Sequence, residues 1–564
     1  MLISKLKSVL TKNFYLYSIL LLIFRPRRFL NEMIFSFMEY RIFFQSLRKL
    51  TDSQRLEAKN VLKTGFKRKI LIVFGSNMNV AFIQLWAFLG LLYKVTGTEV
   101  LCLTSKHSKI QNLYITRCKF DPIFLEDLKF QNEKLDENIL DTVVSLQTFS
   151  DFKNFEIDGV PFGKMGLSTY SRNRASGLIE VGDERAKNEL RESIIFSLKV
   201  FQASEKIYQS YNVNMIFFVE LFMGYYGALY YAALKRKLNI IRFCGTVRDN
   251  AIVVQHMTEK SDRTHFSSLS EKSLSDLRQM ELTPEIKNEL EKNFADRYGK
   301  RWGLSSRNQE NTEVVSVDQI RNAFGIVKDK KIGIIYSHIL YDTLYFNGEY
   351  LFENYASWLV ETVKIAAENP NIEWFIKIHP SNNWRGEHEY YHKGRYEEIR
   401  LIDEHIGQLP DHIRFIYPDT PFSPYSWLQV ADFGVTITGT SGIELGALGK
   451  NVIVGGTGRY ETVGFTINSS TAKEYRKVLL KSHQLSKPSE KQKRIAQKFA
   501  HATFCRKPFS LDFFIAKPRV GKKKIFGTDD LAYSYALGNS ERLPVSLVDF
   551  LNWSLDNSDI DFLT

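Results

Sequence analysis

The chain has 564 residues, which at about 150 residues a domain suggests two to four domains. Its composition, 44% hydrophobic and 25% charged, is that of a globular protein and excludes disordered, collagen-like and disulfide-scaffold chains. The four cysteines, at positions 102, 118, 244 and 505, form no Cys-x-x-Cys pair and are too scattered for a disulfide framework. We therefore expect a reducing compartment.

The positive charge is concentrated at the N-terminus. Of the formal net charge of +13, residues 1–50 carry +7, from nine Lys or Arg against Glu32 and Glu39. The remaining residues hold +6 and are nearly balanced. A protein that binds nucleic acid through its body has basic clusters there, so we expect no nucleic-acid partner.

An apolar run of eleven residues, 14–24, is followed by the basic sequence Arg-Pro-Arg-Arg. A membrane-spanning helix needs about 20 apolar residues, and a signal peptide needs small residues at its cleavage site, so neither fits. Basic residues beside apolar and aromatic ones suit a helix in the interface of an anionic membrane. We expect residues 1–60 to associate with the inner face of the cytoplasmic membrane; the alternative is an amphipathic helix packed on the body.

Apolar runs separated by amphipathic stretches predict an α/β domain over residues 61–315. Continuous runs of this kind are typical of buried parallel strands. The expected strands are 70–74, 99–103, 215–219 and 239–243, and the expected helices are 80–93 and 224–234. Residues 258–315 are polar and have no strand signal, so we expect surface helices and a linker there.

The pattern restarts in a second domain over residues 316–490. Its expected strands are 332–336, 373–378, 413–417, 432–436 and 451–454, with helices at 350–367 and 443–448. Two such arrays predict an α/β chain of two doubly wound Rossmann-type domains that face each other across a cleft. We expect the tail, residues 491–564, to pack back on the first domain.

The fourth expected strand of the second domain ends in a pattern typical of a phosphate site. Ligands of open α/β sheets bind at the carboxyl ends of strands. Small residues there precede a helix: Thr438, Thr440, Ser441 and Gly442. Helix N-terminal N–H groups attract anions, and small residues let an anion approach the backbone. A capping box between Ser441 and Glu444 is the alternative, but it leaves the other small residues unexplained, so we favour phosphate.

Two neighbouring strand ends add polar side chains. His379 lies beside Lys377, and Pro380 directs the chain so that the imidazole points off the sheet edge, where it would stabilise a leaving phosphate. A lone histidine is more often structural. The loop with Gly456 and Tyr460 follows the last strand, and we expect it to close over a nucleotide, although a glycine-rich loop alone is a weak signal.

Two stretches of the second domain resemble a known family. Residues 331–380 (KIGIIYSHILYD to FIKIHP) and 435–475 (VTITGTSGIELGALGKNVIVGG to AKEY) look like bacterial capsule polysaccharide biosynthesis glycosyltransferases. That group includes Kdo transferases and is related in pattern to sialyltransferases with a His-Pro motif. The resemblance covers residues 330–480, and the first half is similar mainly in layout.

The resemblance implies a GT-B fold with a nucleotide-sugar donor, CMP-activated by preference, and a lipid-linked or polysaccharide acceptor. It implies that His379, Thr440 and Ser441 hold the donor phosphate and that Glu444 binds the ribose hydroxyls. It also implies transfer without a metal or further cofactor. No Asp-x-Asp motif lies near the expected site, and a helix dipole would take the place of the metal.

We expect the base that activates the acceptor in the first domain. Glu220 follows the third expected strand and is our choice for this base; the alternative is that it caps a turn or pairs with an arginine. Asp342 and His338 are second choices. Arg172 and Arg174 either hold an anionic acceptor or are solvated surface arginines.

Three other functions stay open at this point. A polyol-phosphate transferase of the teichoic-acid type has a similar His-Pro motif, but it moves phosphorus to its acceptor. A non-catalytic module would bind nucleotide or phospho-glycan and scaffold an assembly at the membrane. A nucleotide-sugar epimerase of the same fold needs no acceptor.

We predict that residues 1–50 hold the protein at an anionic membrane surface. Each basic residue near such a surface contributes about 1 kcal/mol, which salt screens. Liposome co-sedimentation should show binding that high salt weakens and that deletion of residues 1–50 abolishes. Equal sedimentation of the full and truncated chains would mean a packed helix without membrane contact.

Overall fold

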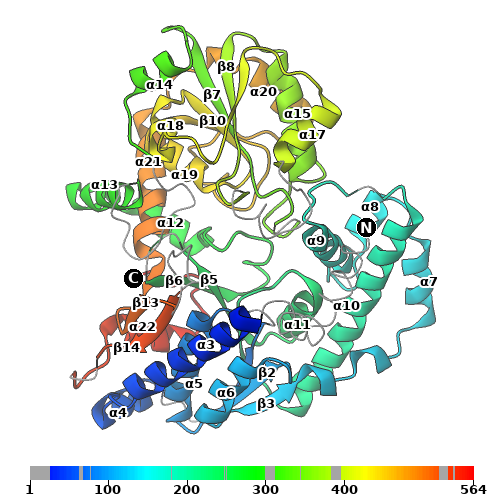
Figure 1. The fold of residues 1–564 in the computed structure, drawn as a ribbon, viewed down its shortest axis with the longest axis vertical. Coiled ribbons are helices and arrows are strands. Elements are labelled where there is room, and N and C mark those ends of the chain that lie inside the picture. The colour runs from blue at the N-terminus through cyan, green and yellow to red at the C-terminus, as the bar shows by residue number, and fades with distance from the viewer. Residues whose placement is uncertain are drawn as a thin grey trace.

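A computed structural model of the chain describes residues 26–62, 68–75, 78–179, 181–246, 248, 250–298, 312–342, 345–382, 396–519, 531–537 and 540–564. The apolar run at 14–24 lies outside these residues. Two mainly parallel sheets with helices packed on them form two domains, one above the other in Figure 1. The expected fold class, two doubly wound α/β domains, is confirmed.

The first sheet has seven strands in the order β12-β6-β5-β4-β1-β2-β3. β1 to β5 are parallel, whereas β6 is antiparallel to β5, and β12 is antiparallel to β6. The strands are β1 (Lys69–Val73), β2 (Glu99–Thr104), β3 (Asp121–Phe124), β4 (Met215–Phe218), β5 (Asn239–Gly245), β6 (Ala251–Met257) and β12 (Pro508–Ser510).

Helices on the two sides of this sheet enclose two separate apolar cores. One core lies under α9, α10 and α11, and it also includes residues of the second domain. The other lies under α3, α5, α6 and the C-terminal tail. The helices are α3 (Pro26–Leu47), α4 (Asp52–Val61), α5 (Val80–Lys94), α6 (Lys109–Cys118), α7 (Glu137–Ser145), α8 (Phe149–Asn154), α9 (Phe162–Arg174), α10 (Glu184–Ser210) and α11 (Gly224–Lys235).

The second sheet has five parallel strands in the order β11-β10-β7-β8-β9. Its strands are β7 (Lys331–Tyr336), β8 (Ile372–Lys377), β9 (Ile413–Ile416), β10 (Phe433–Thr436) and β11 (Asn451–Val454). Its helices are α14 (Val317–Ala323), α15 (Tyr355–Ala367), α17 (Glu397–His405), α18 (Pro424–Val430), α19 (Thr440–Ala447), α20 (Ala472–Leu480) and α21 (Glu490–His501). The two domains share one winding pattern, because β3-β2-β1-β4-β5 and β9-β8-β7-β10-β11 have the same strand order.

The chain crosses between the domains twice. It passes upward through α12 (Glu271–Gln279) and α13 (Pro284–Tyr298), and it returns through α21, the orange helix at the left of Figure 1. A π-helical turn, η4 (Ala502–Arg506), ends α21 and leads into β12. The tail then forms a hairpin, β13 (Phe514–Pro518) and β14 (Leu531–Tyr535), and helix α22 (Val545–Leu555).

Helix α3 is packed on one side and apolar on the other. Phe43 and Leu47 are buried against the first domain. Phe37, Met38 and Ile42 are exposed large apolar residues of the same helix. Among the helices that the structure describes, none is long and apolar enough to cross a membrane.

A buried ion pair joins the two ends of the tail, the residue before β12 and the segment after α22. Lys507 Nζ lies 2.7 Å from a carboxylate oxygen of Asp561, and both side chains are 0% exposed. Removing one partner leaves the other charge buried and uncompensated. We therefore predict that Lys507→Met lowers the free energy of unfolding by about 3–5 kcal/mol in denaturant titrations.

A surface pair in the same region serves as the control. Lys272 of α12 pairs with Asp559 of the tail, and both side chains are largely solvated. Exposed pairs contribute little, so Lys272→Met should leave stability unchanged. Equal effects of the two substitutions would contradict this account of the tail.

Candidate functional site

The candidate site lies where the winding of the second sheet reverses. The chain leaves β7 toward β8 and β9 on one side, and later places β10 and β11 on the other. Ligands of such sheets bind at this switch point, beyond the carboxyl ends of the two central strands. His338 follows β7, and turn 436–442 follows β10.

Two side chains of loop 455–460 hold the carbonyl oxygens of turn 436–442. The Arg459 Nη1 donates to the Thr438 carbonyl at 2.6 Å, and the Tyr460 hydroxyl donates to the Gly439 carbonyl at 2.8 Å. A trans peptide places its N–H opposite its carbonyl, so the N–H of Thr440 points away from Tyr460. Gly442 makes room for this arrangement, because a Cβ there would lie 2.3 Å from the Tyr460 hydroxyl oxygen.

Helix α19 begins within the same turn, at Thr440. Its N-cap is Gly439, and it has no side-chain capping bond, so the alternative of a Ser441–Glu444 capping box is wrong. The first N–H groups of a helix have no partner inside the helix, and the helix dipole is positive there. The N–H groups of Thr440 and Ser441 therefore suit a phosphate oxygen.

The carboxylate of Glu444 is already engaged. It lies 2.6 Å from Arg297 Nη2, both side chains are buried, and the Tyr298 hydroxyl also donates to it. Arg297 and Tyr298 belong to α13. The expected contact of Glu444 with ribose is not supported by this arrangement, since the carboxylate anchors α19 to α13.

Lys377 ends β8 as a buried cation. Its side chain is 6% exposed, and its Nζ has no hydrogen-bond partner among the described residues. Burial lowers the pKa of Lys377 to about 8, because the charged form loses its hydration. An anion bound nearby would restore a partner for this charge.

His379 follows in a loop that Glu398 holds. The backbone N–H of His379 donates to Glu398 Oε1 at 3.3 Å, and its Nδ1 accepts from the N–H of Ser381 at 3.2 Å. The neutral imidazole therefore carries its proton on Nε2. Glu398 is fully buried and also accepts from Ser337 at 2.7 Å; burial raises its pKa.

His338, which follows β7, is hydrogen-bonded to the backbone that follows β10. Its Nε2 accepts from the Ile437 N–H at 3.2 Å, and its ring stacks on Tyr355 at 4.4 Å between centroids. Burial, with the nearby charges of His379 and Arg459, lowers the pKa of His338 to about 3. His338 is therefore neutral near pH 7 and supports the turn through a hydrogen bond.

Loop 455–460 also docks on the preceding segment of its own domain. The N–H of Thr457 donates to the Glu349 carbonyl at 2.8 Å, and a Cβ at Gly456 would lie 2.8 Å from that same oxygen. Glu349 in turn pairs with Lys164 of α9 at 2.8 Å. Gly456 and Tyr460 therefore position the loop and connect it to the first domain.

The first domain places Glu220 at the boundary with the second. Glu220 follows β4, and its Oε1 accepts from the N–H groups of Leu221 and Phe222 at 2.9 and 3.0 Å. It thus caps its own turn, as one alternative expected. Phe222 stacks on Phe346 of the second domain, with ring centroids 4.6 Å apart.

The remaining residues that the sequence predicts at the domain boundary lie in two different places. Arg172 pairs with Asp342 across the two domains at 3.2 Å. Arg174 instead pairs with Glu189 of α10 at 2.7 Å. Asp342 and Arg172 are therefore brought together near the site, whereas Arg174 belongs to the first domain's helical layer.

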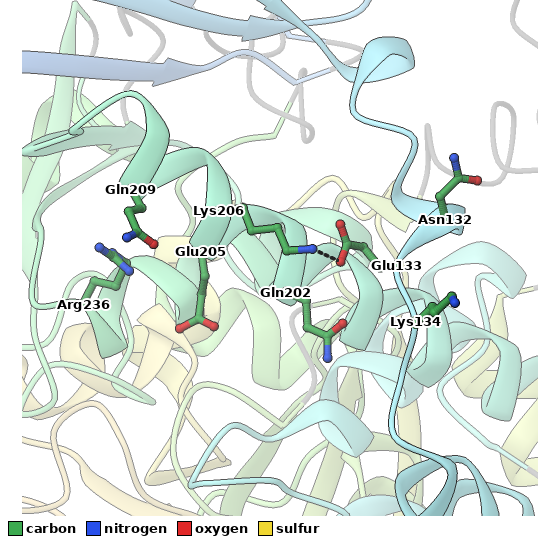
Figure 2. A pocket seen from close by; sticks show the side chains of 8 residues that line it. All are labelled: Asn132, Glu133, Lys134, Gln202, Glu205, Lys206, Gln209 and Arg236. Carbon is green, nitrogen blue, oxygen red and sulfur yellow. Dashed lines mark hydrogen bonds and ion pairs between the residues drawn. The ribbon is translucent and has the colours of Figure 1, made fainter.

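Two further clusters of polar residues lie away from the strand ends and turn 436–442. Glu289, His501 and Cys505 place potential metal-ligand atoms within 4.8 Å of one another on α13, α21 and η4, and Glu289 pairs with His501 at 2.8 Å. A polar groove lies between α10 and the segment before α7 (Figure 2), lined by Asn132, Glu133, Lys134, Gln202, Glu205, Lys206, Gln209 and Arg236. None of these residues belongs to the strand ends or to turn 436–442.

No protein-family model matches the chain, and no curated protein is similar to it. Among solved structures, KpsC of Thermosulfurimonas dismutans, a beta Kdo 2,4 transferase, is 13% identical at a TM-score of 0.29, over 60% of this chain and 87% of that chain. The UDP-GlcNAc 2-epimerase of Neisseria meningitidis, bound to UDP-GlcNAc, is 12% identical at a TM-score of 0.24, over 77% and 97%. At these TM-scores the likenesses do not decide function, which has to come from the site itself.

We predict opposite effects of Lys377→Met on stability and on nucleotide binding. Between pH 8 and 10.5 the unfolded chain holds this proton and the folded chain releases it. The penalty of the buried charge is therefore full below pH 8 and fades toward pH 10.5. Lys377→Met should raise the Tm at pH 7, with a smaller gain at pH 10, and weaken nucleotide binding about tenfold or more at pH 7.

Thermal unfolding and calorimetry at both pH values measure the two effects. Lys364→Met is the control, because Lys364 is exposed and pairs with Glu361 on the surface of α15. A lower Tm of Lys377→Met at pH 7, together with unchanged nucleotide affinity, would show that the ammonium is structural.

Proposed function

We propose that this protein is a GT-B glycosyltransferase that moves a sugar from a nucleotide-sugar to a lipid-linked or polysaccharide acceptor. The observation that carries the proposal is turn 436–442, whose carbonyls are held by Arg459 and Tyr460 and whose N–H groups begin α19. Capsule or other surface polysaccharide is the proposed product. CMP is the proposed nucleotide by resemblance alone.

In the proposed reaction, an acceptor hydroxyl attacks the anomeric carbon of the donor. The bond between that carbon and the phosphate oxygen breaks, and the electron pair leaves with the phosphate. The N–H groups of Thr440 and Ser441, with Lys377 and His379, stabilise the negative charge that develops there. This set of donors supports transfer without a metal, and we expect activity to persist in excess EDTA.

The acceptor proton goes to a carboxylate in this mechanism. Asp342 is paired with Arg172 across the domain boundary, so its carboxylate is already engaged. Glu220 binds backbone N–H groups through one oxygen and lies at the carboxyl end of β4, at the switch point of the first sheet. Glu220 is therefore our proposal for the catalytic base.

The exposed apolar residues of α3 support a membrane-facing role for the N-terminal segment. Phe37, Met38 and Ile42 lie beside the exposed Arg41. Aromatic and aliphatic residues next to basic ones suit an anionic interface. Serine substitutions at Phe37 and Ile42 test this role more directly than a deletion, because they leave the buried side of α3 in place.

A nucleotide screen and one substitution test the proposed function. Ligands that bind the native state raise its Tm, so CMP, CDP, UDP and GDP are compared by thermal shift. With the nucleotide-sugar selected in this way, His379→Ala should lower turnover on the order of a hundredfold or more. His405→Ala, at the exposed end of α17, is the control.

The reaction products distinguish a glycosyltransferase from the three alternative functions. Phosphorus on the acceptor would indicate a polyol-phosphate transferase, and an isomerised donor without any acceptor would indicate an epimerase. Nucleotide binding that never leads to turnover would favour a scaffold. An unchanged rate in folded His379→Ala protein would remove this histidine from the mechanism.

A further inference from the structure

The first domain contains a buried arginine, Arg242, that forms no ion pair with a carboxylate among the residues that the structure describes. Arg242 lies in β5, beside Phe218 of β4, and is 6% exposed. Its Nε and Nη1 have no hydrogen-bond partner among the described residues. The guanidinium lies 4.9 Å from the centre of the Phe222 ring and 5.7 Å from that of Phe266. Such ring contacts offset part of the lost hydration but leave the N–H donors of Nε and Nη1 unused.

The closest candidate for a partner does not fill this role. Glu220 follows the neighbouring strand, and both Glu220 and Arg242 act electrostatically on Cys244, to which Arg242 also makes a side-chain hydrogen bond. No ion pair joins the two within the described part of the chain, and Glu220 Oε1 accepts from backbone N–H groups instead. Arg242 therefore keeps a buried positive charge with donors available to an anion.

His265 lies in the segment that follows β6 and stacks at 4.3 Å on the ring of Phe266, which the Arg242 guanidinium also contacts. Its Nδ1 accepts from the backbone N–H of Ser267 at 3.1 Å and lies 2.8 Å from the hydroxyl of the same residue. In the neutral ring the proton then lies on Nε2. Burial, followed by the charges of Arg459 and Arg242, holds the pKa of His265 well below its usual range. His265 is thus a neutral donor near both arginines.

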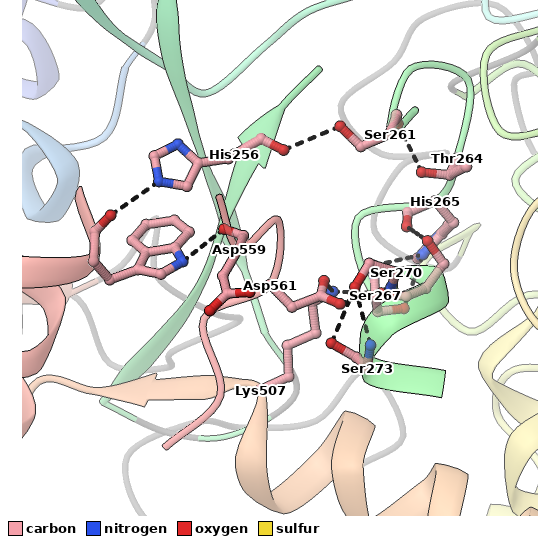
Figure 3. A network of polar contacts seen from close by, with 12 residues as sticks. His256, Ser261, Thr264, His265, Ser267, Ser270, Ser273, Lys507, Asp559 and Asp561 are labelled. Carbon is pink, nitrogen blue, oxygen red and sulfur yellow. Dashed lines mark hydrogen bonds and ion pairs between the residues drawn. The ribbon is translucent and has the colours of Figure 1, made fainter. Parts of the chain in front are cut away.

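The tail fixes the segment that carries His265 (Figure 3). Lys507 pairs with Asp561 and donates to the Ser268 carbonyl, while Asp561 accepts from the N–H of Ser270 at 2.7 Å. On the other side, the N–H of His265 donates to the Gly458 carbonyl at 2.8 Å, one residue before Arg459. The segment is therefore held between the two domains, next to the loop that supports turn 436–442.

The number of buried cations exceeds what turn 436–442 needs for one phosphate. Lys377 and His379 are the proposed partners of the phosphate at this turn, and Arg459 holds the turn's backbone. Arg242 belongs to the other domain, and among the described residues no hydrogen bond joins it to Lys377 or to turn 436–442. A buried charge without a partner is costly, so its retention in a binding region points to a ligand that supplies the missing charge.

We propose that Arg242 and His265 form a second anion subsite, which takes a carboxylate or phosphate carried by the substrate in addition to the phosphate that links nucleotide and sugar. This inference rests on the proposed function and names its substrate class as acidic. The acidic group has two possible sources, the donor sugar or the acceptor. Both offer oxygen atoms to the guanidinium N–H groups and to Nε2–H of His265.

Two pairs of probes separate these sources. UDP-glucose and UDP-glucuronate share a nucleotide and differ by one carboxylate. Glycerol and glycerol 3-phosphate differ by one phosphate, and they are titrated into the full chain with and without the nucleotide that the screen selects. Calorimetry compares the wild type with Arg242→Gln. Arg236→Gln is the matched control, because Arg236 is an exposed arginine of the same domain, in the groove of Figure 2.

We expect the wild type and Arg236→Gln to bind the acidic member of at least one pair tenfold or more tightly. In Arg242→Gln this preference should fall below twofold, with nucleotide affinity unchanged. Preference within the first pair assigns the acid to the donor, and preference within the second assigns it to the acceptor. No preference in either pair, or an equal preference in Arg242→Gln, would overturn the subsite.

Thermal unfolding without ligand separates this role from a structural one. Arg242→Gln removes a buried unpaired charge, so its Tm should equal or exceed that of the wild type. A lower Tm with the acidic preference intact would mean that Arg242 only supports the fold. If no nucleotide binds the wild type, the proposed function fails, whereas glycerol 3-phosphate without nucleotide still tests the subsite.

Discussion

Two hydrogen bonds decide which way the backbone of turn 436–442 faces. Arg459 and Tyr460 bind the carbonyls of Thr438 and Gly439, and peptide planarity then directs the N–H of Thr440 to the opposite side. The donor site as proposed uses that N–H and the N-terminus of α19. It therefore depends on two residues of loop 455–460 whose own side chains are bound to the protein backbone. Glycine at position 442 is part of the same constraint, since a side chain would displace Tyr460.

Buried cations connect stability with binding in this molecule. Lys377, Arg459 and Arg242 each keep at least one nitrogen without a hydrogen-bond partner in the described residues. Such groups destabilise the free protein and bind anions strongly, because the same low dielectric acts on both. Contacts across the domain boundary, such as Arg172 with Asp342 and Phe222 with Phe346, join the two domains that carry these cations. The charges of Arg242 and Arg459, one from each domain, both act on His265.

Most strands of the two sheets could be predicted, because buried parallel strands are continuous apolar runs. The run at 70–74 corresponds to β1, and the run at 451–454 to β11. Strands β3 and β12 gave no such signal, since they are short and begin or continue with a proline. β12 pairs with β6 only because the tail returns through α21, and that pairing joins residues some 250 positions apart.

The sequence by itself determined the local part of the site: small residues before a helix, and a histidine and a lysine at the end of a strand. Each of these features lies within one short stretch of chain, so the hydrophobic periodicity of the sequence is enough to place it. Only the tertiary structure decided which groups hold the turn, that Glu444 turns toward Arg297, and that Glu398 fixes His379. It also decided that Arg242 remains buried without a carboxylate partner in the described part of the chain. Each of these depends on distances between side chains from separate elements, and those distances exist only once the sheets and helices are packed.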